Sequence, residues 1–135
     1  MATPKMLPII VSDRLDATHD FYVDTLGWAP VDKMEGYLQV RAGSDEAAPE
    51  LAFMAAQPPE GPLGARIPLR TGLVVSIAVA DADAHRERLR ERGADPAPVA
   101  DRPWGWRSFL LDDPNGVTLD FFHPIAQDPA QDASS

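Results

Sequence analysis

The sequence predicts an α+β fold made of two related halves, each with the order strand, helix and three further strands. Both halves show the same succession of short apolar runs around one helical segment, and a stretch rich in proline and glycine separates them. In the first half we expect a strand at 6–11, a helix at 14–26 and strands at 29–33, 37–41 and 51–55. In the second half we expect a strand at 73–79, a helix between Asp81 and Gly93, and strands near 97–100, 106–111 and 117–123.

Both helices have recognisable ends. Ser12-Asp13 is a plausible cap for the first helix, and Gly27 supplies its C-terminal stop. The second helix is mostly charged, so we expect Ala82 and Leu89 as its inner positions and the pairs Asp83–Arg86 and Glu87–Arg90 on its outside. Its basic run is therefore interpreted as a solvated face.

The halves also match in detail, since strand, helix and strand carry the same turn residues at corresponding places. They define a single domain over 1–124, with module one at 5–56, a linker at 57–72 and module two at 73–124. The linker holds too many prolines and glycines for a regular element. Residues 125–135 are small and polar, and we expect a flexible tail there.

Composition excludes several classes of function. A net charge of -9 and a sequence pI near 4.6 oppose binding to nucleic acid or to anionic membranes. The chain has no cysteine, which excludes disulfides and thiolate sites, and neither a leader segment nor an apolar run long enough to span a membrane is recognisable. We therefore expect a cytoplasmic protein.

Two motifs carry a family resemblance. V-S-D-x(7)-F-Y-x(3)-L-G-W in half one and R-P-W-G-W-R-S-F-L-L-D-D-P-N-G-V-T-L-D-F-F in half two resemble the vicinal oxygen chelate superfamily, which includes glyoxalase I, extradiol dioxygenases and bleomycin-resistance proteins. The likeness covers residues 6–124 and is strongest to the bleomycin-resistance-like members. It implies that the two βαβββ modules form a cup-shaped mixed sheet, with helices outside and a ligand cavity inside.

The resemblance also allows a test for the family's metal site. Enzymatic members bind a divalent metal through the first and fourth strands of each half, and those positions fall here at Met6, at Val74, near Phe53 and at Asp120. Only Asp120 is a competent ligand. The histidines offer no replacement, because His19 and His85 are expected on the outer helices and His123 ends the last strand. We expect no metal and no other cofactor.

Alternation along the strands then selects the residues that face the cavity. Trp104 and Trp106 offer planar rings for stacking, and Asp120 would need a cation, which Arg107, Arg41 or a basic ligand could provide. The predicted ligand-binding residues are Trp104, Trp106, Ser108, Leu110, Asp120, Phe122, Phe53 and Ser76. No catalytic residue is assigned.

These features favour a homodimeric, metal-independent protein that binds a small molecule and acts by sequestration, with a cationic aromatic antibiotic as one candidate ligand. The alternative is an enzyme, either a metal-dependent lyase or dioxygenase or a metal-free enzyme that uses Asp120 as a general base. A regulatory partner protein with a vestigial cavity is a third reading. The sequence leaves the question of enzymatic activity open and leans against it.

Overall fold

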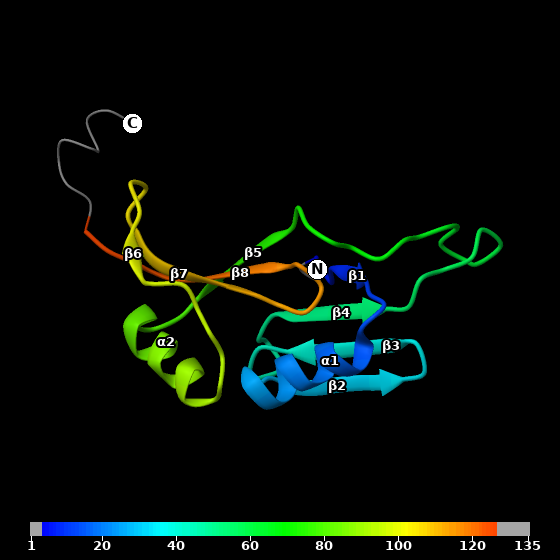
Figure 1. Ribbon diagram of the computed structural model, residues 1–135, viewed down its shortest axis with the longest axis horizontal. Coiled ribbons are helices and arrows are strands. Elements are labelled where there is room, and N and C mark those ends of the chain that lie inside the picture. Colours follow the sequence, from blue (N-terminus) through cyan, green and yellow to red (C-terminus); the bar gives the residue numbers. More distant parts are fainter. Residues whose placement is uncertain (1–3, 127–135) are drawn as a thin grey trace. The chain divides into compact units, whose positions relative to one another are not determined.

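The computed structural model describes residues 4–126 of the chain (Figure 1). Within them the chain forms two four-stranded mixed sheets and a few helices, which confirms the predicted α+β class. One compact unit contains the chain up to Thr71 together with Pro114–Gly116, and the other contains Gly72–Asp113 and the chain from Val117 onward. We call them unit 1 and unit 2. One domain over 1–124 stays a prediction, and most of the expected tail, 127–135, lies outside the described residues.

Unit 1 contains one sheet with the strand order β1-β4-β3-β2. Its strands are β1 (Ile9–Val11), β2 (Ala29–Met34), β3 (Tyr37–Arg41) and β4 (Glu50–Met54). β1 pairs with β4 in parallel, whereas the other neighbours are antiparallel. The order of elements and their approximate limits agree with the prediction for the first half.

The predicted helix 14–26 is only partly an α-helix. α1 covers Leu15–His19, and the chain continues as the π-helix η1 (Asp20–Thr25), in which Leu26 N–H donates to the carbonyl of Phe21 at 2.9 Å. The wider turn places the ring of Tyr22 in the core, where it lies 5.1 Å from Phe53 between ring centroids. The prediction of a regular α-helix was therefore wrong for the second part of this segment, Asp20–Thr25.

Ser12-Asp13 does not cap α1 as expected. The helix begins after Arg14 with no side-chain cap hydrogen bond. The Ser12 oxygen accepts from Arg14 N–H at 3.0 Å, and the Ser12 hydroxyl donates to Asn115 Oδ1 at 2.5 Å. Asn115 Nδ2 in turn donates to the Thr18 hydroxyl at 2.9 Å, so the turn Pro114–Gly116 is bound to the start of α1 within unit 1. The buried hydroxyls thus connect the amide of the turn to the start of the helix.

Gly116 provides a direct test of this docked turn. It adopts φ +84, and a Cβ there would overlap the backbone carbonyl of Arg70, whereas Gly93 adopts φ +93 and a Cβ there meets nothing within 4 Å. Both Gly→Ala changes introduce backbone strain, but only Gly116→Ala adds a clash. We expect urea denaturation followed by circular dichroism to show Gly116→Ala less stable than Gly93→Ala by about 1–3 kcal/mol. Equal losses would contradict this packing.

Unit 2 contains the second sheet, with the strand order β5-β8-β7-β6. Its strands are β5 (Val74–Ala78), β6 (Ala100–Asp101), β7 (Trp106–Asp112) and β8 (Thr118–Pro124), and its helix is α2 (Ala82–Glu91). β5 pairs with β8 in parallel, as β1 does with β4. The repeated pairing supports the duplication seen in the sequence.

Three hydrogen bonds hold the start of α2. The Asp81 side chain accepts from the N–H groups of Asp83 and Ala84 at 3.0 and 3.3 Å, and His123 Nδ1 accepts from Ala82 N–H at 2.8 Å. These bonds satisfy donors that a helix start leaves unpaired. The position of α2 over the end of β8 is therefore fixed by polar contacts as well as by packing.

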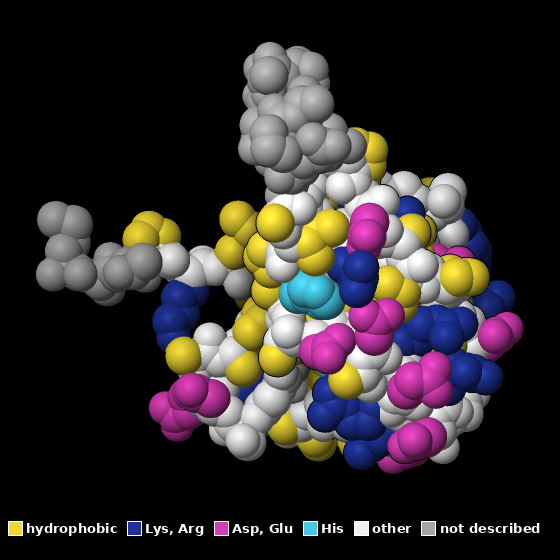
Figure 2. Space-filling model, turned by 90° about the vertical axis from the view of Figure 1, so that its left-hand side faces the viewer, with side chains coloured by type: hydrophobic (Ala, Val, Ile, Leu, Met, Phe, Trp, Pro, Cys, Tyr) yellow, Lys and Arg dark blue, Asp and Glu magenta, His cyan; other side chains and the backbone are white. Residues whose placement is uncertain are grey.

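The faces of α2 mostly agree with the sequence. Its buried residues are Ala82 and Leu89, as predicted, and Arg90 pairs with Glu87 at 3.0 Å. Asp83 pairs with Arg107 of β7 at 3.3 Å, so the predicted Asp83–Arg86 pair was wrong. The side of the molecule on which α2 lies carries Lys and Arg interspersed with Asp and Glu (Figure 2). The basic run is accordingly a solvated and charge-balanced face.

His85 lies on α2, as expected, and its ring points toward the sheet. Its ring lies 4.9 Å from Phe121 and 6.2 Å from Phe109 between centroids. Burial, together with the nearby Arg88, lowers the pKa of His85 below its ordinary value of 6.5. The half-buried imidazole therefore packs against the aromatic residues of the sheet of unit 2.

This lowered pKa predicts a pH dependence of stability. Since unfolding releases His85 to its ordinary pKa, the unfolded chain binds more protons once the pH falls from roughly 7 through 6.5. We expect the free energy of unfolding to fall as the pH decreases from about 6.5 toward the lowered pKa of the folded protein. His85→Leu removes this part of the slope. Identical pH slopes for the wild type and the variant would contradict the assignment.

Candidate functional site

The sheet of unit 2 has one face covered by α2 and a second face on which most of the predicted site residues meet. Phe109, Phe121, Arg107 and His123 all contact α2 or its residues, so they define the helix side. Alternation along β7 and β8 directs their neighbours the other way. We call this second face the open face of unit 2, and it consists of Ser76, Trp106, Ser108, Leu110, Asp120 and Phe122.

An aromatic pair occupies one end of the open face. The rings of Trp106 and Phe122 are stacked, with centroids 3.6 Å apart and planes inclined by 10°. Trp104 lies at their edge, 6.3 Å from Trp106 and 58% exposed. Gly105, with φ +92, makes the sharp turn between the two indoles. The predicted Trp-Gly-Trp segment thus presents one ordered ring and one exposed ring side by side.

Asp120 lies in the middle of the open face and is only 8% exposed. Its Oδ2 accepts a hydrogen bond from the Ser76 hydroxyl at 2.8 Å, because β5 and β8 pair these two residues directly. Its Oδ1 is fully buried and has no hydrogen-bond partner among the described residues. A buried carboxylate oxygen without a hydrogen-bond donor destabilises the folded protein. This atom therefore marks a place where a ligand could supply the missing donor.

Neither arginine expected near Asp120 lies there. Arg107 is on the helix side, where Asp101 at 2.6 Å and Asp83 at 3.3 Å hold it and raise its pKa. Arg41 pairs with Glu50 at 3.2 Å within unit 1. Both expectations were therefore wrong, because each guanidinium has a closer carboxylate on its own face of a sheet.

The orphaned oxygen predicts opposite effects for two substitutions. Asp120→Asn keeps the shape of the side chain and removes the buried charge, so we expect the free energy of unfolding to rise by about 1 kcal/mol. Ser76→Ala removes the donor to Oδ2, and we expect a loss of about 1–3 kcal/mol. Thermal unfolding of the wild type and both variants without ligand would measure these changes in the free energy of unfolding. A destabilised Asp120→Asn protein would show that the carboxylate stabilises the folded protein, which contradicts the prediction.

Arg102 is a site residue that the sequence reasoning missed. Its Nε donates to the Ser108 hydroxyl at 2.8 Å and its Nη2 to the Ser108 carbonyl at 3.5 Å. Ser108 is 1% exposed, so the hydroxyl is fixed under the guanidinium. Arg102 precedes the Trp-Gly-Trp turn, where Gly105 N–H donates to its carbonyl at 3.0 Å. Only this turn, which sequence spacing does not reveal, brings the side chain back over β7.

Phe53 belongs to unit 1, whereas the other predicted site residues belong to unit 2. It is 0% exposed and lies against Tyr22 of η1. Its partner across the strands, Leu38, is also buried. Phe53 is therefore a core residue of unit 1.

The corresponding face of unit 1 carries a polar chain that the sequence reasoning also missed. The Tyr37 hydroxyl donates to Gln39 Oε1 at 2.8 Å, Gln39 Nε2 donates to Glu50 at 2.5 Å, and Arg41 binds the same carboxylate at 3.2 Å. The hydrogen bond from Gln39, with Arg41, lowers the pKa of Glu50, and burial together with Asp32 and Glu50 raises that of Tyr37. The chain consists of three alternate residues of β3, which lie on one face of the sheet, and one residue of β4.

The family's metal positions do not fit a metal in this chain. The matching hydrogen bonds Ser12 N–H to Met54 and Val79 N–H to Phe122 make Ala52 the counterpart of Asp120, one residue before Phe53. Val74 and Ala52 have no side-chain donor atom, and the soft thioether of Met6 does not suit a hard or borderline cation. Asp120 is thus a single carboxylate, hydrogen-bonded to Ser76, among side chains that offer no second metal ligand with a charge.

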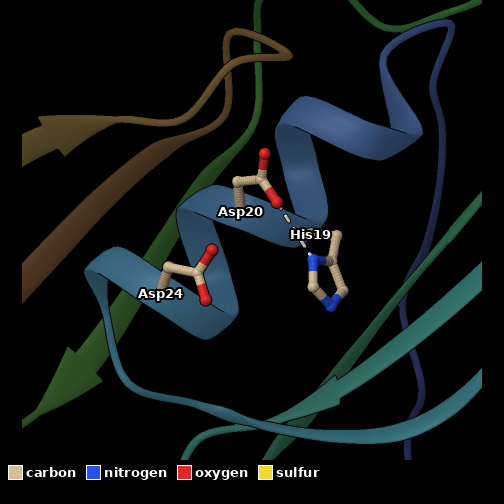
Figure 3. A group of neighbouring side chains, drawn as sticks. All are labelled: His19, Asp20 and Asp24. Carbon is tan, nitrogen blue, oxygen red and sulfur yellow. Dashed lines mark hydrogen bonds and ion pairs between the residues drawn. The ribbon is translucent and has the colours of Figure 1, made fainter.

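One group of possible metal ligands does occur among the described residues, outside both sheets' strands. His19, Asp20 and Asp24 lie on α1 and η1 with ligand atoms within 4.8 Å of one another (Figure 3). His19 Nδ1 is 3.2 Å from Asp20 Oδ1, and both carboxylates are exposed. The group is an acidic helix surface with an internal pair, and it adds nothing to the open face of unit 2.

Comparison with known proteins identifies the family. Residues 6–121 match the model of the glyoxalase/bleomycin resistance protein/dioxygenase superfamily, and the chain belongs to this superfamily. Among proteins with curated descriptions, none matches the sequence significantly. The described residues contain no helix that is long and apolar enough to cross a membrane.

Several solved structures share the fold. A glyoxalase/bleomycin resistance protein/dioxygenase from Nocardioides is 25% identical, with 95% of this chain and 88% of that chain covered and a TM-score of 0.72. An antibiotic binding protein from a Streptomyces species is 26% identical, covering 92% and 98%, with a TM-score of 0.64. A lactoylglutathione lyase from Agrobacterium tumefaciens is 18% identical, covering 90% and 94%, with a TM-score of 0.70, and shows the fold alone.

Proposed function

We propose that this protein binds a planar aromatic small molecule on the open face of unit 2 and sequesters it without a metal. The observation that carries the proposal is the stacked pair of Trp106 and Phe122 beside the orphaned oxygen of Asp120. Stacked rings extend a planar surface for a further ring, and a buried carboxylate favours a cationic group. A cationic aromatic antibiotic meets both requirements, which would make the protein a resistance factor.

Two further observations support binding over catalysis. At the family positions Val74 and Ala52 offer no metal ligand and Met6 offers only a soft thioether, so the donor set is too poor for the metal chemistry of the enzymatic relatives. The antibiotic binding protein from Streptomyces is among the structures similar at 26% identity. The net charge of -9 adds a field that attracts cations. We also propose that the protein is cytoplasmic and homodimeric, as expected from the absence of cysteine and from the family resemblance.

Tryptophan fluorescence tests the binding site. We expect bleomycin or 9-aminoacridine to quench the emission of the full chain, and Trp106→Leu to remove most of that quenching, because the stacked platform is lost. Trp28→Phe serves as the matched control, since Trp28 is buried in unit 1 against Tyr22. Equal quenching of the wild type and Trp106→Leu would contradict a site on the open face.

Three measurements test the remaining parts of the proposal. Elemental analysis should find no stoichiometric nickel, zinc, manganese or iron in the purified protein. Mass spectrometry should recover the bound compound unchanged, whereas a changed compound would favour an enzyme that uses Asp120 as a general base. Analytical ultracentrifugation should give twice the chain mass of 14.7 kDa. A metal or a turnover product would sink the sequestration hypothesis.

A further inference from the structure

Two polar anchors of opposite charge lie on the open face of unit 2. Asp120 provides a buried oxygen, Oδ1, with no hydrogen-bond partner in the described part of the chain, and Arg102 provides a guanidinium held over Ser108. Ionic groups that are partly removed from water need a partner of opposite charge or a set of hydrogen bonds. A ligand that supplies only a cation would satisfy the first anchor and leave the second without a counter-ion.

Arg102 differs from the arginines that stabilise the fold. The two hydrogen bonds of its side chain both go to Ser108, and among the described residues no carboxylate lies within ion-pair distance of it. By contrast, Arg107 and Arg41 are each held by a carboxylate. A guanidinium has five N–H donors in a planar fork that matches a carboxylate or phosphate. The remaining N–H groups of Arg102 are therefore available for an acidic group.

The strand register sets the spacing between Asp120 and Ser108, the residue to which the second anchor, Arg102, is bound. Ser108 lies opposite Phe122, and Leu110 lies opposite Asp120, so Ser108 and Asp120 are diagonal neighbours across β7 and β8. Diagonal neighbours are about 7–8 Å apart, which is comparable with the width of a fused tricyclic ring system. The stacked rings of Trp106 and Phe122 lie at this same part of the face. One flat molecule can thus contact both anchors and the rings.

We infer that the ligand is amphoteric: a planar aromatic molecule with a protonated nitrogen that donates to Asp120 Oδ1 and an acidic group that accepts from Arg102. This inference rests on the proposed function and adds the second anchor to it. Ser108 acts as a positioning residue, because its buried hydroxyl holds the guanidinium. The net charge of -9 predicts a cationic ligand, and only Arg102 adds the requirement for an acidic group.

Isothermal titration calorimetry with three compounds on one ring system tests the inference. The compounds are 9-aminoacridine, acridine-4-carboxylate and 9-aminoacridine-4-carboxylate. We expect the third to bind the full chain at least about tenfold more tightly than either of the others, since it makes both charge-assisted contacts. Its methyl ester should bind no more tightly than 9-aminoacridine, which tests the acidic group without any change to the protein.

Variants assign the two contacts. Arg102→Gln should remove the advantage of the carboxylate and leave 9-aminoacridine unaffected, whereas Arg102→Lys should keep part of the advantage. Asp120→Asn should weaken both amino compounds about tenfold and leave acridine-4-carboxylate unaffected. Arg90→Gln is the matched control, since Arg90 lies on α2 beside Glu87 and loses the same charge far from the open face.

The outcomes separate the inference from the proposed function. Equal affinities of the wild type for 9-aminoacridine and the amphoteric compound, or an undiminished advantage in Arg102→Gln, would overturn the inference while sequestration of a cationic aromatic molecule stands. Failure of all three compounds to bind, with unchanged tryptophan emission, would overturn both. An advantage that falls equally in Arg90→Gln would also overturn the inference, because it would reflect general charge instead of a contact with Arg102.

Discussion

The parallel pairing of β5 with β8 is the constraint on which the candidate site depends. It places Ser76 directly beside Asp120, so that one carboxylate oxygen receives a hydroxyl donor while the other is buried without one. The antiparallel pairing of β8 with β7 then adds Leu110 and Ser108 on the same face. Because the side-chain period of a strand is two, a slip by one residue would exchange this face with the core.

Packing on the helix side keeps that register. Phe109 and Phe121 stack 5.2 Å apart under α2, and His85 adds a neutral ring from the helix. His123 and Asp81 satisfy the first N–H groups of α2, and Arg107 binds Asp83. The polar groups named on the helix side are therefore paired, whereas on the open face Asp120 Oδ1 is buried with no hydrogen-bond partner among residues 4–126. This difference between the two faces of the sheet supports the open face as the candidate site.

The superfamily uses the position of Asp120 for a metal in its enzymatic members, and this chain has kept the carboxylate without the other donors. Ala52, the counterpart in unit 1, has no side-chain donor, and Gln39 and Glu50 of the same unit are bound to each other. Nearby, the Trp-Gly-Trp turn supplies rings and Arg102 supplies a cation. Metal catalysis would need more ligands than these residues offer, whereas aromatic rings and charged groups are what the proposed recognition requires.

The sequence alone determined the element order, the duplication, the inner positions of α2 and the face on which Ser76, Trp106, Ser108 and Asp120 lie, because these follow from periods of 2 and 3.6 and from capping residues. Only the tertiary structure decided which charges meet. Asp83 pairs with Arg107 and not with Arg86, Ser12 donates to Asn115, and the side chain of Arg102 binds Ser108. Pairings between residues far apart in the sequence depend on how turns bring segments together in space. Local periodicity carries no information about which segments meet.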